Sequence, residues 1–182
     1  MAKVIAKVYG DALFDLAFEE NKVDEISSQI DVISQSLKDE PDLKKLLTHP
    51  MIAKEEKQAI IENIFKGRAD DDIVGFFREI AEKERFKNIE DIISYFQDRV
   101  REYKKIGVAY VSSAVTLSEK QKKQIEQKLV NQTPYDSFIM NYSVDPSLIG
   151  GLVVRIGDRV ADSSVKTKIY NMTRNLRNVS LE

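Results

Sequence analysis

The chain of 182 residues contains no cysteine and a single histidine, His49. Without cysteine it can form no disulfide, no thiolate metal site and no thiol nucleophile. Any histidine-rich metal centre or proton relay would have to depend on His49 alone. These two shortages exclude a large part of ordinary enzyme chemistry.

Long apolar runs are also missing, since no stretch approaches the roughly 20 residues that a membrane-spanning helix needs. Met1 leads directly into a segment of mixed charge and not into the apolar region of a signal peptide. We therefore expect a protein that stays in the cytoplasm and does not insert directly into a membrane.

The chain has no surplus of either charge. It carries 28 Lys and Arg against 30 Asp and Glu, a net charge of -2. A general nucleic-acid binder needs excess cations to displace counterions from phosphates, so this balance argues against a nucleic-acid partner. Residues 1–105 have a net charge of -5 and residues 106–182 a net charge of +3. The change of sign indicates two domains with different partners, although drift in surface composition would explain it equally well.

The first 105 residues show the apolar periodicity of helix after helix. In the opening helix, apolar side chains recur at i, i+3 and i+4 from Ile5 to Ala17. Five further segments repeat the pattern, with helix starts at Pro41 and Asp70 and a helix end near Gly67. Six helices with short connections predict an antiparallel bundle over residues 1–105.

The period changes at Gly107. Residues 108–115 and 152–156 predict strands, and residues 138–144 alternate with a period of two. Ser118 and Gln121 form a capping-box pattern that opens a helix, and a last helix follows Val165. We predict an α+β protein: a six-helix bundle followed by a small α/β domain, residues 106–182, in the order strand, helix, strand, strand, helix. The two helices could cover the resulting three-stranded sheet.

Motifs for catalysis or cofactor binding are weak. The glycines between Ile149 and Gly157 lack the spacing of a phosphate-binding loop and predict a tight turn before a strand. His49 precedes a proline in a predicted loop, and the acids at residues 70–72 suit a helix start. Glu82 and Glu84 form a pair of acids without a predicted cleft around them. We therefore predict no catalytic residue, no cofactor and no metal.

Two surface features are open to a partner. The first and fifth helices are apolar over a broad arc, which marks either a groove for another helix or positions surrounded by the rest of the bundle. The last helix carries four cations without an intervening acid, which could bind an acidic partner or simply face solvent. The cations are Lys166, Lys168, Arg174 and Arg177.

Four segments, in order along nearly the whole chain, resemble the ATP synthase delta subunit family, whose mitochondrial counterpart is the oligomycin-sensitivity-conferring protein. The block Val144–Val165 carries the specific signature, with Asp145, Pro146, Gly150, Gly151, Gly157 and Asp162. Three weaker segments are Tyr9–Ala17, His49–Lys57 and Val111–Ser118. The chain departs from the family pattern at Gly10, commonly alanine, and at the charged stretch Glu82–Arg85. Because both lie on the proposed groove helices, we expect them to tune partner affinity.

The resemblance implies a non-catalytic stator subunit on the cytoplasmic side of a bacterial cell membrane, peripheral and part of the proton-driven ATP synthase. It implies that the bundle binds the N-terminal helix of an α subunit between its first and fifth helices. It also implies that the C-terminal domain holds the b subunits of the peripheral stalk. A free-standing cytoplasmic adaptor outside the synthase is the alternative. The candidates for the α-binding groove, some of which must face the bundle core, are Ile5, Tyr9, Ala12, Leu13, Leu16, Ile73, Phe76, Phe77 and Ile80.

The glycine pair in the signature generates a first prediction. Gly150→Asp should loosen the C-terminal domain and its attachment to the stalk, because the turn that orders the domain would be disturbed. Thermal unfolding and binding to b subunits are the measurements. If both remain unchanged, the glycine has no such role.

Overall fold

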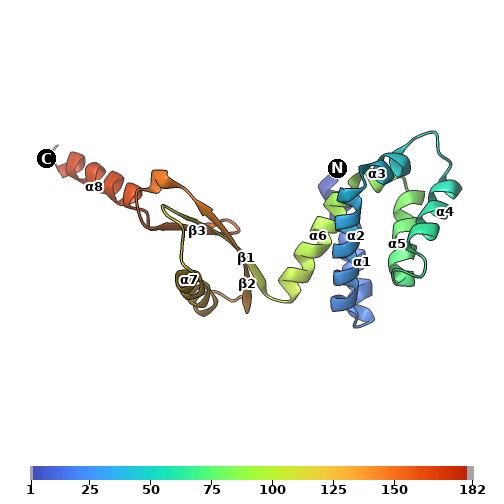
Figure 1. Ribbon diagram of the computed structural model, residues 1–182, viewed down its shortest axis with the longest axis horizontal. Coiled ribbons are helices and arrows are strands. Elements are labelled where there is room, and N and C mark those ends of the chain that lie inside the picture. The colour runs from blue at the N-terminus through green and yellow to red at the C-terminus, as the bar shows by residue number, and fades with distance from the viewer. Residues whose placement is uncertain (1, 180–182) are drawn as a thin grey trace. The chain divides into compact units, whose positions relative to one another are not determined.

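The computed structural model describes residues 2–179, and the side chains of residues 3–174. The chain divides into two compact units, Met1–Val100 and Arg101–Glu182, each of which is described by itself (Figure 1). The division falls inside the last helix of the N-terminal half, a few residues before the boundary that the sequence predicts. The predicted mixture of helices and a sheet is confirmed.

The N-terminal unit is helical. Its helices contribute to one continuous apolar core, in which Ile26, Ile61, Phe77 and Phe96 are fully buried. Most core positions recur every three or four residues, so each helix buries one face. The elements are α1 (Ala2–Glu19), α2 (Val23–Asp39), α3 (Pro41–Thr48), α4 (Lys54–Phe65), α5 (Asp71–Glu82), the 3-10 turn η1 (Phe86–Asn88) and α6 (Ile89–Tyr103).

Gly10 allows α1 and α6 to approach closely. A Cβ added at this glycine would lie 2.5 Å from the Tyr95 ring and 3.3 Å from the Phe96 backbone nitrogen. Next to it, Asp11 accepts a hydrogen bond from the Tyr95 hydroxyl at 3.2 Å and pairs with Arg99 at 3.1 Å. Gly10 is thus buried against α6 and offers no surface of its own to a partner.

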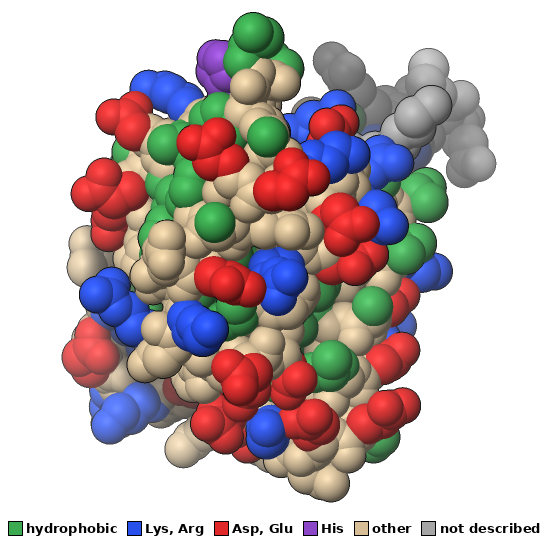
Figure 2. All heavy atoms as spheres, turned by 90° about the vertical axis from the view of Figure 1, so that its right-hand side faces the viewer, with side chains coloured by type: hydrophobic (Ala, Val, Ile, Leu, Met, Phe, Trp, Pro, Cys, Tyr) green, Lys and Arg blue, Asp and Glu red, His purple; other side chains and the backbone are tan. Residues whose placement is uncertain are grey.

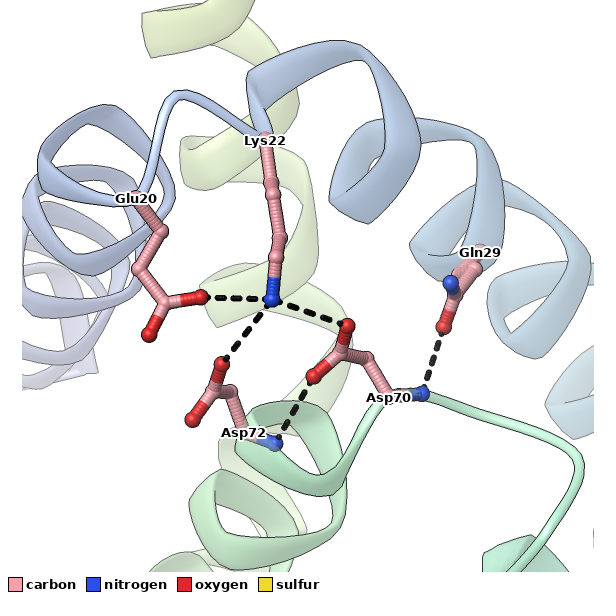
Figure 3. Close-up of polar contacts among 5 residues, drawn as sticks. All are labelled: Glu20, Lys22, Gln29, Asp70 and Asp72. Atoms are coloured by element: carbon pink, nitrogen blue, oxygen red, sulfur yellow. Dashed lines mark hydrogen bonds and ion pairs between the residues drawn. The ribbon is translucent and has the colours of Figure 1, made fainter.

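A cluster of charges fixes the end of α1 and the start of α2 against the first turn of α5 (Figure 3). The Lys22 ammonium lies 2.7 Å from Glu20, 3.4 Å from Asp70 and 4.0 Å from Asp72. Asp70 caps α5 by accepting a hydrogen bond from the Asp72 backbone N–H, and its own N–H donates to Gln29 on α2. The C-terminal end of α1 is thereby held beside the N-terminal end of α5.

The protonation equilibria of the cluster reflect these contacts. The hydrogen bond from Lys22 lowers the pKa of Glu20, and the bond from the Asp72 backbone, with Lys22, lowers the pKa of Asp70. Desolvation and the neighbouring Glu20 raise the pKa of Asp72. Glu20 and Asp70 therefore stabilise the fold when they are charged, whereas the charge on Asp72 opposes it.

The C-terminal unit contains a four-stranded sheet in the order β2-β1-β3-β4. Strands β1 and β2 are parallel, and β1–β3 and β3–β4 are antiparallel. The elements are β1 (Ile106–Ser113), α7 (Glu119–Gln132), β2 (Ser137–Val144), the 3-10 turn η2 (Pro146–Leu148), β3 (Leu152–Ile156), β4 (Arg159–Asp162) and α8 (Val165–Val179).

The prediction of three strands was wrong by one, because β4 forms a hairpin with β3. Residues Ile156 and Arg159 pair across a loop of two residues, Gly157 and Asp158. Gly157 has a φ of 55°, which the tight turn requires. A Gly-Asp pair between two short alternating runs is a hairpin signal that was present in the sequence.

Coverage of the sheet also differs from the prediction. Ala109 and Val111 on β1 are buried on one face, and α7 packs over β2 on that face through a hydrogen bond from the Tyr142 hydroxyl to the Lys122 carbonyl. Helix α8 contacts η2, but Ile169 and Met172 on it remain 51% and 65% exposed. Of the two helices expected to cover the sheet, α7 packs on it, whereas α8 leaves these apolar side chains uncovered.

The close approach of α1 and α6 generates a prediction about glycine. Gly10→Ala should destabilise the protein by about 1–3 kcal/mol, because the added methyl group overpacks the contact with Tyr95. Gly75→Ala on α5 is the matched control: nothing lies within 4 Å of a Cβ added there. That control should stabilise the helix by about 0.5–1 kcal/mol. Urea unfolding measures both, and equal effects would contradict the packing argument.

The charge cluster generates a prediction about pH. Lys22→Met should lower the thermal midpoint at neutral pH, because three carboxylates lose their shared cation. The pKa of Glu20 and of Asp70 is lowered from 4.5 and 3.8, so the stabilisation exists above those values and disappears as the pH falls through the lower folded values. The deficit of the variant should therefore shrink below pH 3.8.

The matched control is Lys44→Met, which removes a single ion pair with Glu90 at 2.6 Å from a side chain of similar exposure. It should cost less than Lys22→Met, because an exposed pair contributes little. A larger loss from the control would show that the cluster does not hold the three elements together.

Candidate functional site

The structure separates the nine candidates for the groove into two sets. Leu13, Ile73, Phe77 and Ile80 are 0–1% exposed and belong to the core. Ile5, Tyr9, Leu16 and Phe76 pack against the core with one side and are half-buried, and Ala12 is exposed. The second set, five residues, is the one that an approaching helix can touch.

The second set lies on α1 and α5, where the half-buried members border the apolar core. Phe76 follows Asp72 by four residues and so shares its side of α5, the side that meets Lys22 beyond the end of α1. On α1, Gly10 and Asp11 face α6, and the flank with Ile5, Ala12 and Leu16 is turned away from them. The Lys22 cluster brings the C-terminal end of α1 beside the N-terminal end of α5, so the two flanks approach each other at that end.

Two exposed apolar residues of α1 were missed in the sequence. Val4 and Val8 are 66% and 60% exposed, although both are apolar. Together with Ala12 they recur every four residues and form a stripe along the outside of α1. The sequence of α1 does contain more apolar residues than one helical face can hold. That excess did not reveal which side of the helix remains uncovered.

Gly75 is a further exposed position on α5. It is exposed in the middle of α5, next to Phe76, and space is open where a Cβ would stand. A glycine inside a helix costs about 1 kcal/mol relative to alanine. Nothing in the fold of the described residues requires this glycine, and its small size permits another backbone to come close.

A hollow lies on the helical unit, between α2, α3 and the end of α4. Its volume is about 610 Å³, and its walls include Val32, Leu37, Leu43 and Phe65. Val32 is 67% exposed there. The sequence analysis did not single out this surface, because the apolar residues of α2 and α4 are well explained as core positions.

The signature positions of the C-terminal half build turns. Asp145 accepts a hydrogen bond from the Ser147 N–H at the start of η2, and Asp162 accepts from the Ser164 N–H and the Thr167 hydroxyl at the start of α8. The Ser147 side chain and N–H lower the pKa of the Asp145 carboxyl, and the Ser164 N–H with the Ser164 and Thr167 side chains lowers that of Asp162. Pro146 occupies the first position of η2.

The glycine pair determines how η2 meets α8. The Gly150 carbonyl accepts a hydrogen bond from the Val165 N–H at 2.9 Å, and a Cβ at Gly150 would lie 3.0 Å from the Val165 side chain. Gly151 has a φ of 76° and would press a Cβ into the backbone at Ser163. The signature thus specifies the junction between η2, β3 and α8.

The acids and the histidine considered for chemistry lie at the surface. His49, Glu82 and Glu84 are exposed, and the acids at residues 70–72 form the first turn of α5. Within residues 2–179, no three histidine or carboxylate side chains converge as a metal site would need. Among the helices described, none is long and apolar enough to cross a bilayer. Figure 2 shows acidic and basic side chains interspersed over one face.

The comparisons with known proteins agree over nearly the full chain. Residues 5–176 match the family model of the ATP synthase delta (OSCP) subunit. The chain is 50% identical over 181 residues to ATP synthase subunit delta of Lachnoclostridium phytofermentans, covering 100% of both chains. It is 33% identical over 172 residues to ATP synthase subunit delta of Halalkalibacterium halodurans, covering 94% of each.

The fold also matches a solved structure. A chain of the Toxoplasma gondii mitochondrial ATP synthase hexamer superimposes with a TM-score of 0.70 at 16% identity, covering 94% of this chain and 96% of that one. This likeness concerns the fold, while the sequence matches carry the assignment. The chain therefore belongs to the ATP synthase delta (OSCP) subunit family, and it is a non-catalytic subunit of the ATP synthase.

Proposed function

We propose that this subunit is the stator link between the catalytic α3β3 head and the b subunits of the peripheral stalk. The helical unit works as a six-helix bundle that holds the head, and the C-terminal unit holds the stalk. The protein is then peripheral, on the cytoplasmic side of a bacterial cell membrane. The full-length matches to synthase subunits leave the free-standing adaptor without support.

The observation that carries the proposal is the apolar strip between α1 and α5. It combines Ile5, Ala12 and Leu16 on α1, bordered by the exposed Val8, with the half-buried Phe76 on α5. A contiguous apolar strip along a helix fits the apolar face of another helix. We assign the N-terminal helix of an α subunit to this strip.

Burial of the strip supplies the binding energy. Removing apolar surface from water contributes about 25 cal/mol per Å² before the costs of association are subtracted. A helix that lies along the strip touches both α1 and α5, whose spacing the Lys22 cluster holds. A force that pulls the bound helix along the strip must then displace many side chains at once.

The C-terminal unit differs from the helical unit in charge. Residues 106–182 have a net charge of +3, and α8 exposes Lys166, Lys168 and Arg174 beside Ile169 and Met172. Among the described residues none of these three cations has a carboxylate within ion-pair distance, although Lys166 lies close enough to Asp145 and Asp162 to lower the pKa of both. Such a surface favours an acidic partner, and we assign the b subunits to this unit.

The test is calorimetric titration of the full chain with a peptide that covers the N-terminal helix of the α subunit of the same synthase. Val8→Glu should weaken binding at least about tenfold, because Val8 lies one turn from both Ile5 and Ala12 and a bound helix would bury the new charge at the edge of the strip. Phe77 is unsuitable for such a test, since it is fully buried and its replacement would disturb the core.

Val32→Glu is the matched control, because Val32 has nearly the same exposure as Val8 and lines the hollow between α2, α3 and the end of α4. It should leave binding unchanged. If Val32→Glu abolishes binding and Val8→Glu does not, the α helix belongs between α2 and α4. Absence of binding by the folded wild-type chain would contradict the assignment of this helix as partner.

A further inference from the structure

One face of the sheet in the C-terminal unit is only half covered by a helix. Helices pack about 10 Å apart, and neighbouring strands lie about 4.8 Å apart, so one helix covers about two strands. A four-stranded sheet therefore needs two helices on a buried face. Helix α7 packs over β2, whereas no helix of the described residues makes comparable contact with the part of the same face formed by β3 and β4.

The uncovered part is a groove of about 810 Å³ between α7 and the β3–β4 hairpin. Its floor includes Leu152, Val154 and Ala161, which lie on the same face as the buried Val111. Ile125 and Leu129 of α7 form one wall. A helix is about 10 Å across, so this volume corresponds to roughly two helical turns.

Cations stand on both walls of the groove. Lys128 lies on α7, and Arg159 lies on β4. Neither forms an ion pair with a carboxylate within the described part of the chain, whereas Lys122 on the same helix pairs with Glu119 at 2.7 Å. Asp158, in the hairpin loop, is the one acid that lines the groove. An apolar floor between two unpaired cations complements a helix with an apolar face flanked by acids.

We propose that an acidic amphipathic helix of the peripheral stalk lies in this groove beside α7 and completes the cover of the sheet. This inference rests on the proposed function, since it names the surface on which the C-terminal unit holds the b subunits. Apolar side chains of that helix contact Val154 and Ala161, and its flanking carboxylates pair with Lys128 and Arg159.

Because the chain contains no cysteine, a single introduced cysteine can be labelled specifically with a crosslinker. Ala161→Cys, labelled with a benzophenone maleimide, places the probe in the groove. Asn141→Cys is the matched control, because Asn141 is exposed and pairs with Tyr110, on the opposite face of the sheet. Each variant is assembled into the purified synthase and irradiated. The groove predicts at least fivefold more crosslinking to b from residue 161 than from residue 141.

The outcomes separate the inference from the function on which it rests. If the synthase retains b but residue 161 crosslinks to α8 of the same chain, or residue 141 crosslinks b equally well, the groove is not the stalk site. If the wild-type chain does not retain b at all, the proposed function itself is wrong.

A charge reversal gives an independent measurement. Arg159→Glu should weaken binding of the soluble domain of b to the full chain about tenfold, and the loss should diminish as salt is added. Lys120→Glu makes the same change on α7 outside the groove and should leave the affinity within about twofold. If both variants lose affinity equally, the effect comes from net charge alone and the groove is not the binding site. Circular dichroism verifies that each variant is folded.

Discussion

The ammonium group of Lys22 is the contact on which the shape of the helical unit's outer surface depends. Three carboxylates from two parts of the chain converge on it, and one of them, Asp70, also caps α5. An exposed ion pair alone contributes little to stability, but a network that also caps a helix fixes geometry. Here it joins the end of α1 and the start of α2 to the first turn of α5, beside the surface that we propose for the α-subunit helix.

The two units use different means to leave apolar surface free. In the helical unit, α1 carries more apolar residues than one face can bury, so Val4 and Val8 remain outside. In the C-terminal unit, a four-stranded sheet has a single helix on its buried face. In both, the uncovered surface runs along a helix that the rest of the unit holds in place. Such surfaces suit a protein whose task is to hold other helices under load.

The family signature, Val144–Val165, is the most specific part of the sequence, and its residues mainly account for turns in the fold. Asp145 and Asp162 cap η2 and α8, and Gly151 permits a turn that any larger residue would block. Gly10 is similar, because its lack of a side chain serves α6 and not a partner. A short motif can therefore identify a family through residues that build turns, since turns tolerate fewer substitutions than an apolar surface does.

The sequence by itself determined the element order through β3, the helical starts at Pro41 and Asp70, and the mixed class of the protein. Those features follow from local rules: helical period, strand alternation, capping and turn chemistry. It also listed nine groove candidates, but it did not reveal that Leu13 and Phe77 lie in the core while Phe76 lies at the surface. Periodicity shows that a helix face is apolar; whether that face is covered depends on segments far away in the chain. For the same reason only the tertiary structure decided that Gly10 meets Tyr95, that α8 leaves apolar side chains exposed, and that the sheet has an open groove beside α7.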